Sequence, residues 1–171
     1  TVVLIARWTY YTVGDYKETK IKYLSLEKEG EKTKDLTKTA LFKGIEDTFS
    51  RYKEHGIKVV ILLQAPMQDN QPDEIYFSAF DENNHLDLSL LNTHSVLKSK
   101  SDDLQRNINT YIIHEAKQYD NVRVINPADT LCNNGHCPVG NNEYSYYFDD
   151  DHLSIKGSMV LKGALEKSFE K

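Results

Sequence analysis

Hydrophobic residues in this chain gather in three short runs that are separated by polar stretches and by helix-periodic stretches. Each run is rich in Val and Ile, which is typical of strands buried on both faces of a parallel sheet. The runs cover residues 2–5, 57–63 and 121–126. Apolar residues recur at helical spacing from Leu36 to Tyr52 and from Leu104 to Ala116, and a last helical pattern follows Ser154, a candidate N-cap. The alternation of strands and helices predicts an α/β fold with a parallel sheet and right-handed crossovers.

Local signals mark the ends of the first helix and the segments between elements. Asp35 is the expected N-cap of that helix, and Gly56 is its expected C′ residue. We expect residues 9–34 to form a surface excursion and residues 67–98 and 128–153 to be long and irregular. Connections of that length in a compact domain are usually functional or flexible.

The carboxyl ends of the predicted strands indicate where chemistry should be sought. In open α/β sheets, the active crevice lies just beyond those ends. Arg7 and Trp8 follow the first strand, Gln64 follows the second, and a long loop follows the third after Asn126. Candidate functional side chains should therefore come from these three places.

Composition narrows the class of protein. The chain has 171 residues and a formal net charge of −5, so we expect one domain and no non-specific nucleic-acid binding. Its 39% hydrophobic and 27% charged residues suit a soluble globular domain. No apolar run approaches the ~20 residues that a bilayer span requires. We treat residues 1–171 as a single domain.

The most informative polar motif is Asp149-Asp150-Asp151-His152, which stands just before the last helix. Residue i of such a turn can curl back toward i+3, so Asp149 could orient the His152 ring while Asp150 and Asp151 point elsewhere. A hydrolytic triad needs an imidazole that a carboxylate holds in this way. Two other interpretations stay open at this point, namely a solvated acidic turn and a carboxylate–histidine site for Ca²⁺ or Zn²⁺.

Cys132 and Cys137 are the two cysteines of the chain, with four residues between them. Asn134-Gly135 favours a tight turn there, so a small disulfide loop is the preferred interpretation, and it implies an oxidising compartment. Two free thiols, or a metal site that includes His136, are the alternatives.

The chain opens at Thr1, inside what we interpret as a buried strand, and has no initiator Met. Natural domains rarely begin inside a strand, because a chain end needs a solvated lead-in. We therefore expect a fragment of a longer polypeptide, whose upstream strands would cover the free edge of the first strand.

Several blocks resemble the SGNH hydrolases, and more narrowly the extracytoplasmic SGNH domain fused to membrane acyltransferase-3 proteins. The block Asp149 to Ser154 with Gly157 is similar to the D-x-x-H block of the family, and the run that ends in Ala6-Arg7-Trp8 is similar to a family strand. The second strand with Pro66 at its exit, and the loop from Asn126 through both cysteines, also match the family layout. The resemblance implies a flavodoxin-like three-layer α/β/α fold.

The resemblance also implies site roles, with Asp149 as the triad acid and His152 as the general base. The nucleophile block of the family, Gly-Asp-Ser, does not occur in this sequence. Gly14-Asp15-Tyr16 has tyrosine at the critical position, and we reject it as the nucleophile turn. We expect the serine and the N-terminal strands to lie upstream, and we expect this fragment alone to be inactive. No cofactor and no metal are implied.

A further departure concerns oxyanion binding. Where the general SGNH pattern has Gly-x-Asn, this chain has Ala6-Arg7-Trp8. Arg7 is therefore a candidate for stabilising the oxyanion or for binding a glycan or carboxylate, and the alternative is an ion pair with one of the Asp residues. Trp8 is a candidate packing or sugar-stacking residue, and Gln64 is a candidate substrate-binding residue at the rim of the site.

The resemblance implies an O-acetyltransferase that acts on a cell-surface glycan. Its partners would be an acyl donor, a glycan acceptor and a membrane acyltransferase domain in the same polypeptide, with no nucleic acid. The domain would lie outside the cytoplasm, in the periplasm or on the outer face of the membrane. The alternatives are a carbohydrate esterase and a non-catalytic glycan-binding module whose triad has decayed.

Overall fold

A computed structural model describes residues 1–169 of the chain, which form two compact units. The first unit holds residues 1–64 and 104–125. The second holds residues 65–103 and the described chain from residue 126 onward. Among these described residues, no helix combines the length and apolar character that a bilayer span requires.

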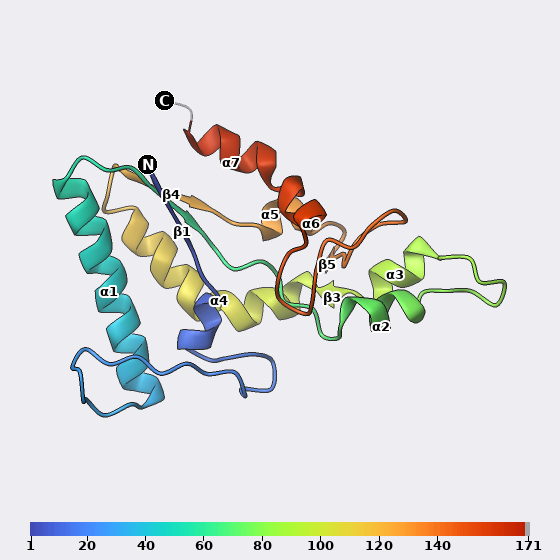
Figure 1. The fold of residues 1–171 in the computed structure, drawn as a ribbon, viewed down its shortest axis with the longest axis horizontal. Helices are drawn as coiled ribbons and strands as arrows, with labels where there is room; N and C mark the ends of the chain where they lie inside the picture. Colours follow the sequence, from blue (N-terminus) through green and yellow to red (C-terminus); the bar gives the residue numbers. More distant parts are fainter. Residues whose placement is uncertain (170–171) are drawn as a thin grey trace. The chain divides into compact units, whose positions relative to one another are not determined.

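A parallel three-stranded sheet forms the centre of the first unit (Figure 1). Its strands are β1 (Val2–Ile5), β2 (Val59–Leu62) and β4 (Val122–Ile125), in the order β1-β2-β4. The three hydrophobic runs therefore do form strands, and the α/β class with a parallel sheet is confirmed.

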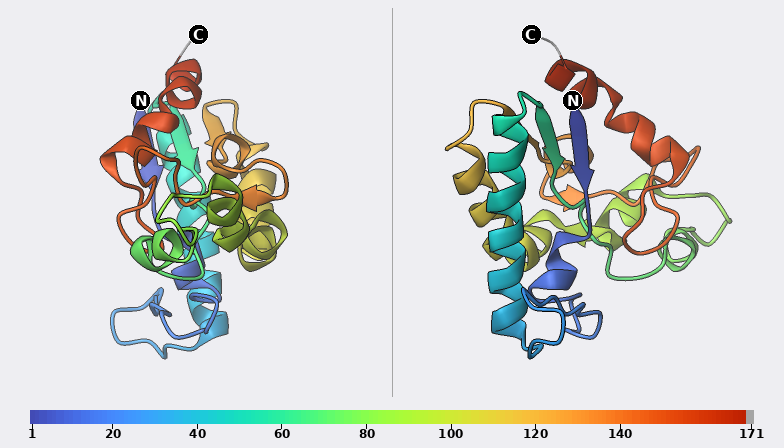
Figure 2. Two further views of the ribbon diagram at one scale, coloured as in Figure 1. Left: turned by 90° about the vertical axis from the view of Figure 1, so that its right-hand side faces the viewer. Right: turned by 60° about the vertical axis from the view of Figure 1, so that its left-hand side comes forward.

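Two long helices contribute to the core of this unit. They are α1 (Lys34–Glu54), which lies alongside the strands in Figure 2, and α4 (Lys98–Ala116), whose part from Leu104 onward belongs to this unit. Tyr111 of α4 stacks on Phe42 of α1, with ring centroids 3.6 Å apart. The buried core comprises Trp8, Leu41, Ile45, Phe49, Val59, Ile61, Leu63, Ile108, Ile112 and Ala116.

The first strand departs from its expected burial. Ile5 is 68% exposed and Val3 38% exposed, whereas every residue of β2 is buried. Successive strand side chains point to opposite faces, and β1 is an edge strand of the sheet. The prediction that residues 2–5 are buried on both faces was therefore wrong.

The ends of α1 are close to those expected. Thr33 caps the helix by accepting a hydrogen bond from the Leu36 N–H at 3.2 Å, so the N-cap is Thr33 rather than Asp35. Asp35 lies in the first turn instead, where a negative charge is also favourable. Gly56 has φ +65° as the predicted C′ residue.

The segment after β1 begins inside the unit. The 3-10 helix η1 (Trp8–Tyr11) buries its first three residues, Trp8, Thr9 and Tyr10. The expected surface excursion over residues 9–34 therefore starts with a packed turn, because the side chains of this turn are large or hydrogen-bonded within the core.

Short elements make up the second unit, apart from the first turns of α4. They are α2 (Pro72–Phe77), α3 (Leu88–His94), β3 (Val96–Leu97), α5 (Ala128–Leu131), β5 (His136–Cys137), α6 (Ile155–Val160) and α7 (Lys162–Phe169). Strands β3 and β5 pair antiparallel, and α2 lies beside α3 (Figure 1). Residues 67–98 and 128–153 are thus more regular than expected, because a small core of Ile75, Ala79, Leu91, Val139 and Tyr147 orders them.

Candidate active site

The carboxylate of Asp149 holds the turn formed by residues 149–152, which we call the acidic turn. Its Oδ1 accepts hydrogen bonds from the backbone N–H groups of Asp151 and His152, at 3.0 and 2.7 Å. Its Oδ2 lies 2.7 Å from Nδ1 of the His152 ring. One side chain thus shapes the turn and orients the ring, as the i to i+3 spacing predicted.

Asp151 also faces the histidine, contrary to expectation. Its Oδ1 lies 3.1 Å from Nδ1 of His152, and its side chain is only 1% exposed. The tight turn produced by the bonds to Asp149 folds the neighbouring carboxylate back toward the ring. The prediction that Asp151 points elsewhere was therefore wrong, although Asp149 remains the nearer partner of the ring.

The electrostatics of the turn keep Asp149 ionised. Burial raises the pKa of Asp149, but hydrogen bonds from the Asp151 N–H and from the His152 ring and N–H outweigh burial and lower the pKa to about 2. An ionised carboxylate beside Nδ1 favours the tautomer that carries its proton on Nδ1. That tautomer leaves the lone pair of Nε2 available as a base.

The ring is accessible on its other side. The His152 side chain is 51% exposed, and within the described part of the chain its Nε2 makes no hydrogen bond. This geometry suits a general base, which needs one nitrogen held and the other free to take a proton.

The same three side chains also fit the metal interpretation. Asp149, Asp151 and His152 can bring ligand atoms within 4.8 Å of one another. Nδ1 of His152 already faces both carboxylates, so a cation bound through that nitrogen would have to separate it from Asp149. The arrangement accounts for all three side chains without an ion.

A short ladder and a capped helix anchor the acidic turn on its C-terminal side. Tyr147 pairs with Leu153 in an antiparallel bridge, and Phe148 donates its N–H to the His152 carbonyl at 2.8 Å. Ser154 caps α6 as predicted, because its Oγ accepts a hydrogen bond from the Gly157 N–H at 3.0 Å. These bonds fix the point at which the chain leaves the turn.

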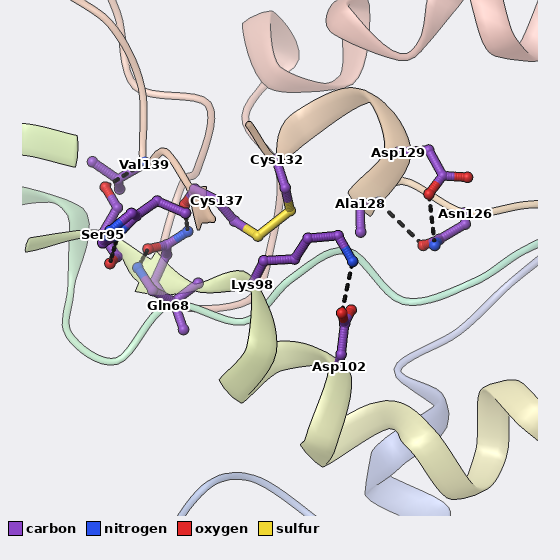
Figure 3. Close-up of a disulfide and its surroundings, with 12 residues drawn as sticks. Gln68, Ser95, Lys98, Asp102, Asn126, Ala128, Asp129, Cys132, Cys137 and Val139 are labelled. Carbon is purple, nitrogen blue, oxygen red and sulfur yellow. Dashed lines mark hydrogen bonds and ion pairs between the residues drawn. A yellow bond between two sulfur atoms is a disulfide. The ribbon is translucent and has the colours of Figure 1, made fainter. Parts of the chain in front are cut away.

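On its N-terminal side, the turn is tied to Gln68, a residue that the sequence analysis missed. The Gln68 N–H donates to the Asp150 carbonyl at 2.7 Å. The buried Gln68 amide also donates to the Cys137 carbonyl at 3.0 Å and accepts from the Val96 N–H at 3.1 Å (Figure 3). Gln68 therefore connects the acidic turn to both strands of the β3–β5 pair.

The predicted disulfide is present between Cys132 and Cys137 (Figure 3). Asn134 and Gly135 between them have φ values of +45° and +82°, as in a type I′ turn. The free-thiol interpretation and the metal site with His136 are thus excluded for this structure. The disulfide closes the loop whose Cys137 carbonyl accepts from Gln68.

The other candidate residues belong to the first unit. The Arg7 guanidinium lies 4.6 Å from the centre of the Tyr10 ring. Trp8 is buried, and its Nε1–H donates to the Leu62 carbonyl at 2.8 Å. Gln64 is buried, and its Oε1 accepts from the N–H and the hydroxyl of Thr9. Trp8 and Gln64 thus have packing roles, while the substrate roles of all three residues stay predictions.

The Gly14-Asp15-Tyr16 segment forms a structural turn. Gly14 has φ +87°, and the Asp15 carboxylate accepts hydrogen bonds from the Lys17 N–H and from both the N–H and the hydroxyl of Thr19. Burial raises the pKa of Asp15, but these hydrogen bonds together lower it below its ordinary value. The carboxylate is fully engaged in shaping its own loop.

Comparison with known proteins identifies the family. A search of the curated proteins found no match. Among solved structures, the chain is similar to the periplasmic domain of a lipopolysaccharide acetyltransferase from Salmonella ser. Paratyphi A, with 14% sequence identity and a TM-score of 0.48. The match covers 85% of this chain and 54% of that one, so the chain spans about half of its length. The family model described as "SGNH domain (fused to AT3 domains)" matches residues 1–167, and the chain therefore belongs to this SGNH domain family.

Proposed function

We propose that this domain takes part in transferring an acyl group, most simply acetyl, to a hydroxyl of a cell-surface glycan. His152 is the general base and Asp149 is the carboxylate that orients it. The nucleophilic serine comes from a part of the polypeptide outside these residues, since the sequence contains no Gly-Asp-Ser. The observation that carries the proposal is the 2.7 Å contact between Nδ1 of His152 and Oδ2 of Asp149.

The proposed reaction has two proton-balanced halves. In the first, Nε2 of His152 takes the proton of the serine hydroxyl while the serine oxygen attacks the acyl carbonyl carbon. The same proton then passes to the leaving group of the donor. In the second, Nε2 takes the proton of a sugar hydroxyl while the sugar oxygen attacks the acyl-serine. The serine oxygen then leaves and recovers the proton, so the enzyme returns to its starting state.

Arg7 is the proposed group for the oxyanion or for the glycan. It directly follows Ala6 at the carboxyl end of the first strand, where open α/β sheets carry their ligands. Its guanidinium rests on the Tyr10 ring, and such stacking limits the orientations of the side chain. A fixed positive charge of this kind can stabilise a developing oxyanion.

Family membership and the disulfide support the proposed setting. The family model describes SGNH domains fused to AT3 domains, which supports a membrane acyltransferase domain in the same polypeptide. The Cys132–Cys137 disulfide fits an oxidising compartment. We therefore place the domain outside the cytoplasm, next to the membrane, where it would meet a cell-surface glycan.

The test uses a polypeptide that restores the upstream segment, with hydrolysis of p-nitrophenyl acetate as the readout. We expect His152→Ala to lower kcat by at least roughly 10³-fold. His114→Ala, which changes an exposed histidine of α4, is the matched control and should keep full activity. Full activity in His152→Ala would overturn the assignment of the base.

Two further arms separate the alternatives. Activity that a chelator abolishes would favour the metal interpretation of the acidic turn. Acyl transfer to an added sugar in competition with water supports the transferase, whereas hydrolysis alone at saturating sugar favours the esterase.

A further inference from the structure

Exposed aromatic side chains gather around a hollow on α2 in the second unit. The hollow has a volume of about 320 Å³, at the lower end of the range of ligand pockets. Phe77 is 77% exposed and Phe80 is 43% exposed. Single exposed apolar residues are ordinary, but rings grouped around one hollow indicate a binding surface. The lining residues are Pro72, Asp73, Tyr76, Phe77, Phe80 and Ser145.

Tyr76, one of the lining residues of this α2 hollow, is held in place by hydrogen bonds of the protein itself. The Tyr76 hydroxyl lies 2.8 Å from the Asn141 carbonyl and 2.9 Å from the Tyr144 carbonyl, and it donates its proton between them. Gly140 leaves room for this contact, because a Cβ at that position would meet the Tyr76 hydroxyl. Burial raises the pKa of Tyr76 to about 12, so the hydroxyl remains a neutral donor. A preformed surface loses little entropy when it binds.

The chemistry of the lining indicates a neutral sugar. The C–H face of a pyranose is apolar and packs on aromatic rings, while its hydroxyls need polar acceptors. Asp73 is an exposed residue of this lining, and its carboxylate is the acceptor that we assign to these hydroxyls. Asp73 and Glu74 both lie in the first turn of α2, and two negative charges there disfavour an anionic lipid surface.

Backbone pairing connects the α2 hollow to the acidic turn within the same unit. Ser145 lines the hollow, and Phe148, three residues later, donates its N–H to the His152 carbonyl. Three residues span at most about 10 Å when fully extended, and bends at Tyr146 and Phe148 shorten this span. One short segment therefore carries both the hollow and the acidic turn, which suits a glycan that places one sugar in the hollow and the next one near His152.

We propose that the α2 hollow binds a neutral pyranose of the acceptor glycan, with Phe77 and Phe80 stacking on the sugar face and Asp73 accepting its hydroxyls. This inference rests on the proposed function and adds an acceptor subsite to it.

The binding test uses the 171-residue chain with labelled aromatic side chains. The probes are the methyl pyranosides of glucose, galactose, mannose and rhamnose. Each is titrated into the protein, and its binding is followed by NMR. We expect at least one of them to shift the resonances of Tyr76, Phe77 and Phe80. Phe77→Ala should weaken that binding by roughly tenfold. Phe169→Ala, which removes an exposed phenylalanine of α7 outside the hollow, is the matched control and should bind normally.

Three results would overturn the inference. The first is that none of the four pyranosides shifts these resonances. The second is that Phe169→Ala weakens binding as much as Phe77→Ala does. The third is that the chain sediments with phosphatidylethanolamine–phosphatidylglycerol vesicles and that Phe77→Ala removes this sedimentation, which would identify a membrane-binding surface instead.

The inference and the proposed function fail in different ways. Pyranoside binding should be the same in His152→Ala as in the parent. If the unaltered longer polypeptide binds pyranosides but transfers no acyl group, the function is overturned and the subsite is kept. Acyl transfer with an unchanged acceptor KM in Phe77→Ala would overturn the subsite and keep the function. Acyl transfer with a raised KM and an unchanged kcat supports both.

Discussion

The backbone N–H of Gln68 lies 2.7 Å from the carbonyl oxygen of Asp150, so a buried glutamine from one segment holds the acidic turn of another. The same residue satisfies one backbone group on β3 and one on β5. The position of the His152 ring therefore depends on a glutamine that, within the described chain, forms no hydrogen bond with the ring or with Asp149. Gln68 is a positioning residue in the proposed mechanism.

We expect Gln68→Ala to destabilise the chain by about 3 kcal/mol, since it leaves the Val96 N–H and the Cys137 carbonyl buried without partners. Urea unfolding measures this loss. Gln118→Ala, which changes an exposed glutamine after α4, is the control and should stay within about 0.5 kcal/mol of the parent. If Gln68→Ala loses no more unfolding free energy than the control does, the Gln68 amide does not contribute to the stability of the chain.

The low pKa of Asp149 predicts a specific dependence of stability on pH. Its folded-state pKa of about 2 lies below its ordinary value of 3.8, since the hydrogen bonds to its carboxylate outweigh the opposing effect of burial. A depressed pKa contributes stability that is present above about pH 4 and is lost as the pH falls toward 2. The difference in unfolding free energy between the parent and Asp149→Asn should therefore shrink between about pH 4 and 2.

Urea unfolding of both proteins across this pH range measures that difference. Glu143→Gln, which removes an exposed charge from the same segment, should show no such change below pH 4. A parent-to-variant difference that stays constant down to pH 2 would mean that the Asp149 carboxylate is not held as described.

Sequence reasoning predicted the site where its contacts are local and missed it where they are not. The Asp149–His152 contact joins residues three apart, so a turn pattern was sufficient to predict it. The side-chain bonds of Gln68 reach residues 28 and 69 positions away, and no pattern along the chain signals them. Asp151 was misjudged because its orientation depends on how tightly the turn closes.

The elements of the fold were likewise predicted where their signal is a long pattern and missed where it is short. Long periodic segments predicted the three strands and the two long helices of the first unit. The six residues of α2 and the seven of α3 are too short to show a period, although two start signals were present. Gln71 and Glu74 form a capping box around Pro72, and Asp87 caps α3. These capping residues form local hydrogen bonds, so they can be recognised in the sequence, and they predict the starts of both helices.

Replacing Cys132 and Cys137 by Ser should lower the stability of the chain. A cross-link that closes a loop this short is worth about 2 kcal/mol through the entropy of the unfolded chain. Unfolding by urea without reductant measures the loss, and adding dithiothreitol to the parent should reproduce it. Two reactive thiols in the denatured, unreduced parent would contradict the disulfide.

Gly157→Ala should destabilise the second unit, because a methyl group at this position overlaps the Tyr146 backbone carbonyl. A rigid backbone group cannot move aside as a flexible side chain can, so we expect a loss of about 1–3 kcal/mol in urea unfolding. Gly163→Ala is the matched control, since an added Cβ there meets no atom within 4 Å. Gly163 lies in α7, where alanine should be neutral or stabilising by up to about 1 kcal/mol. Equal responses of the two variants would mean that α6 does not pack against Tyr146, and the anchoring of the acidic turn by Ser154 would then need another explanation.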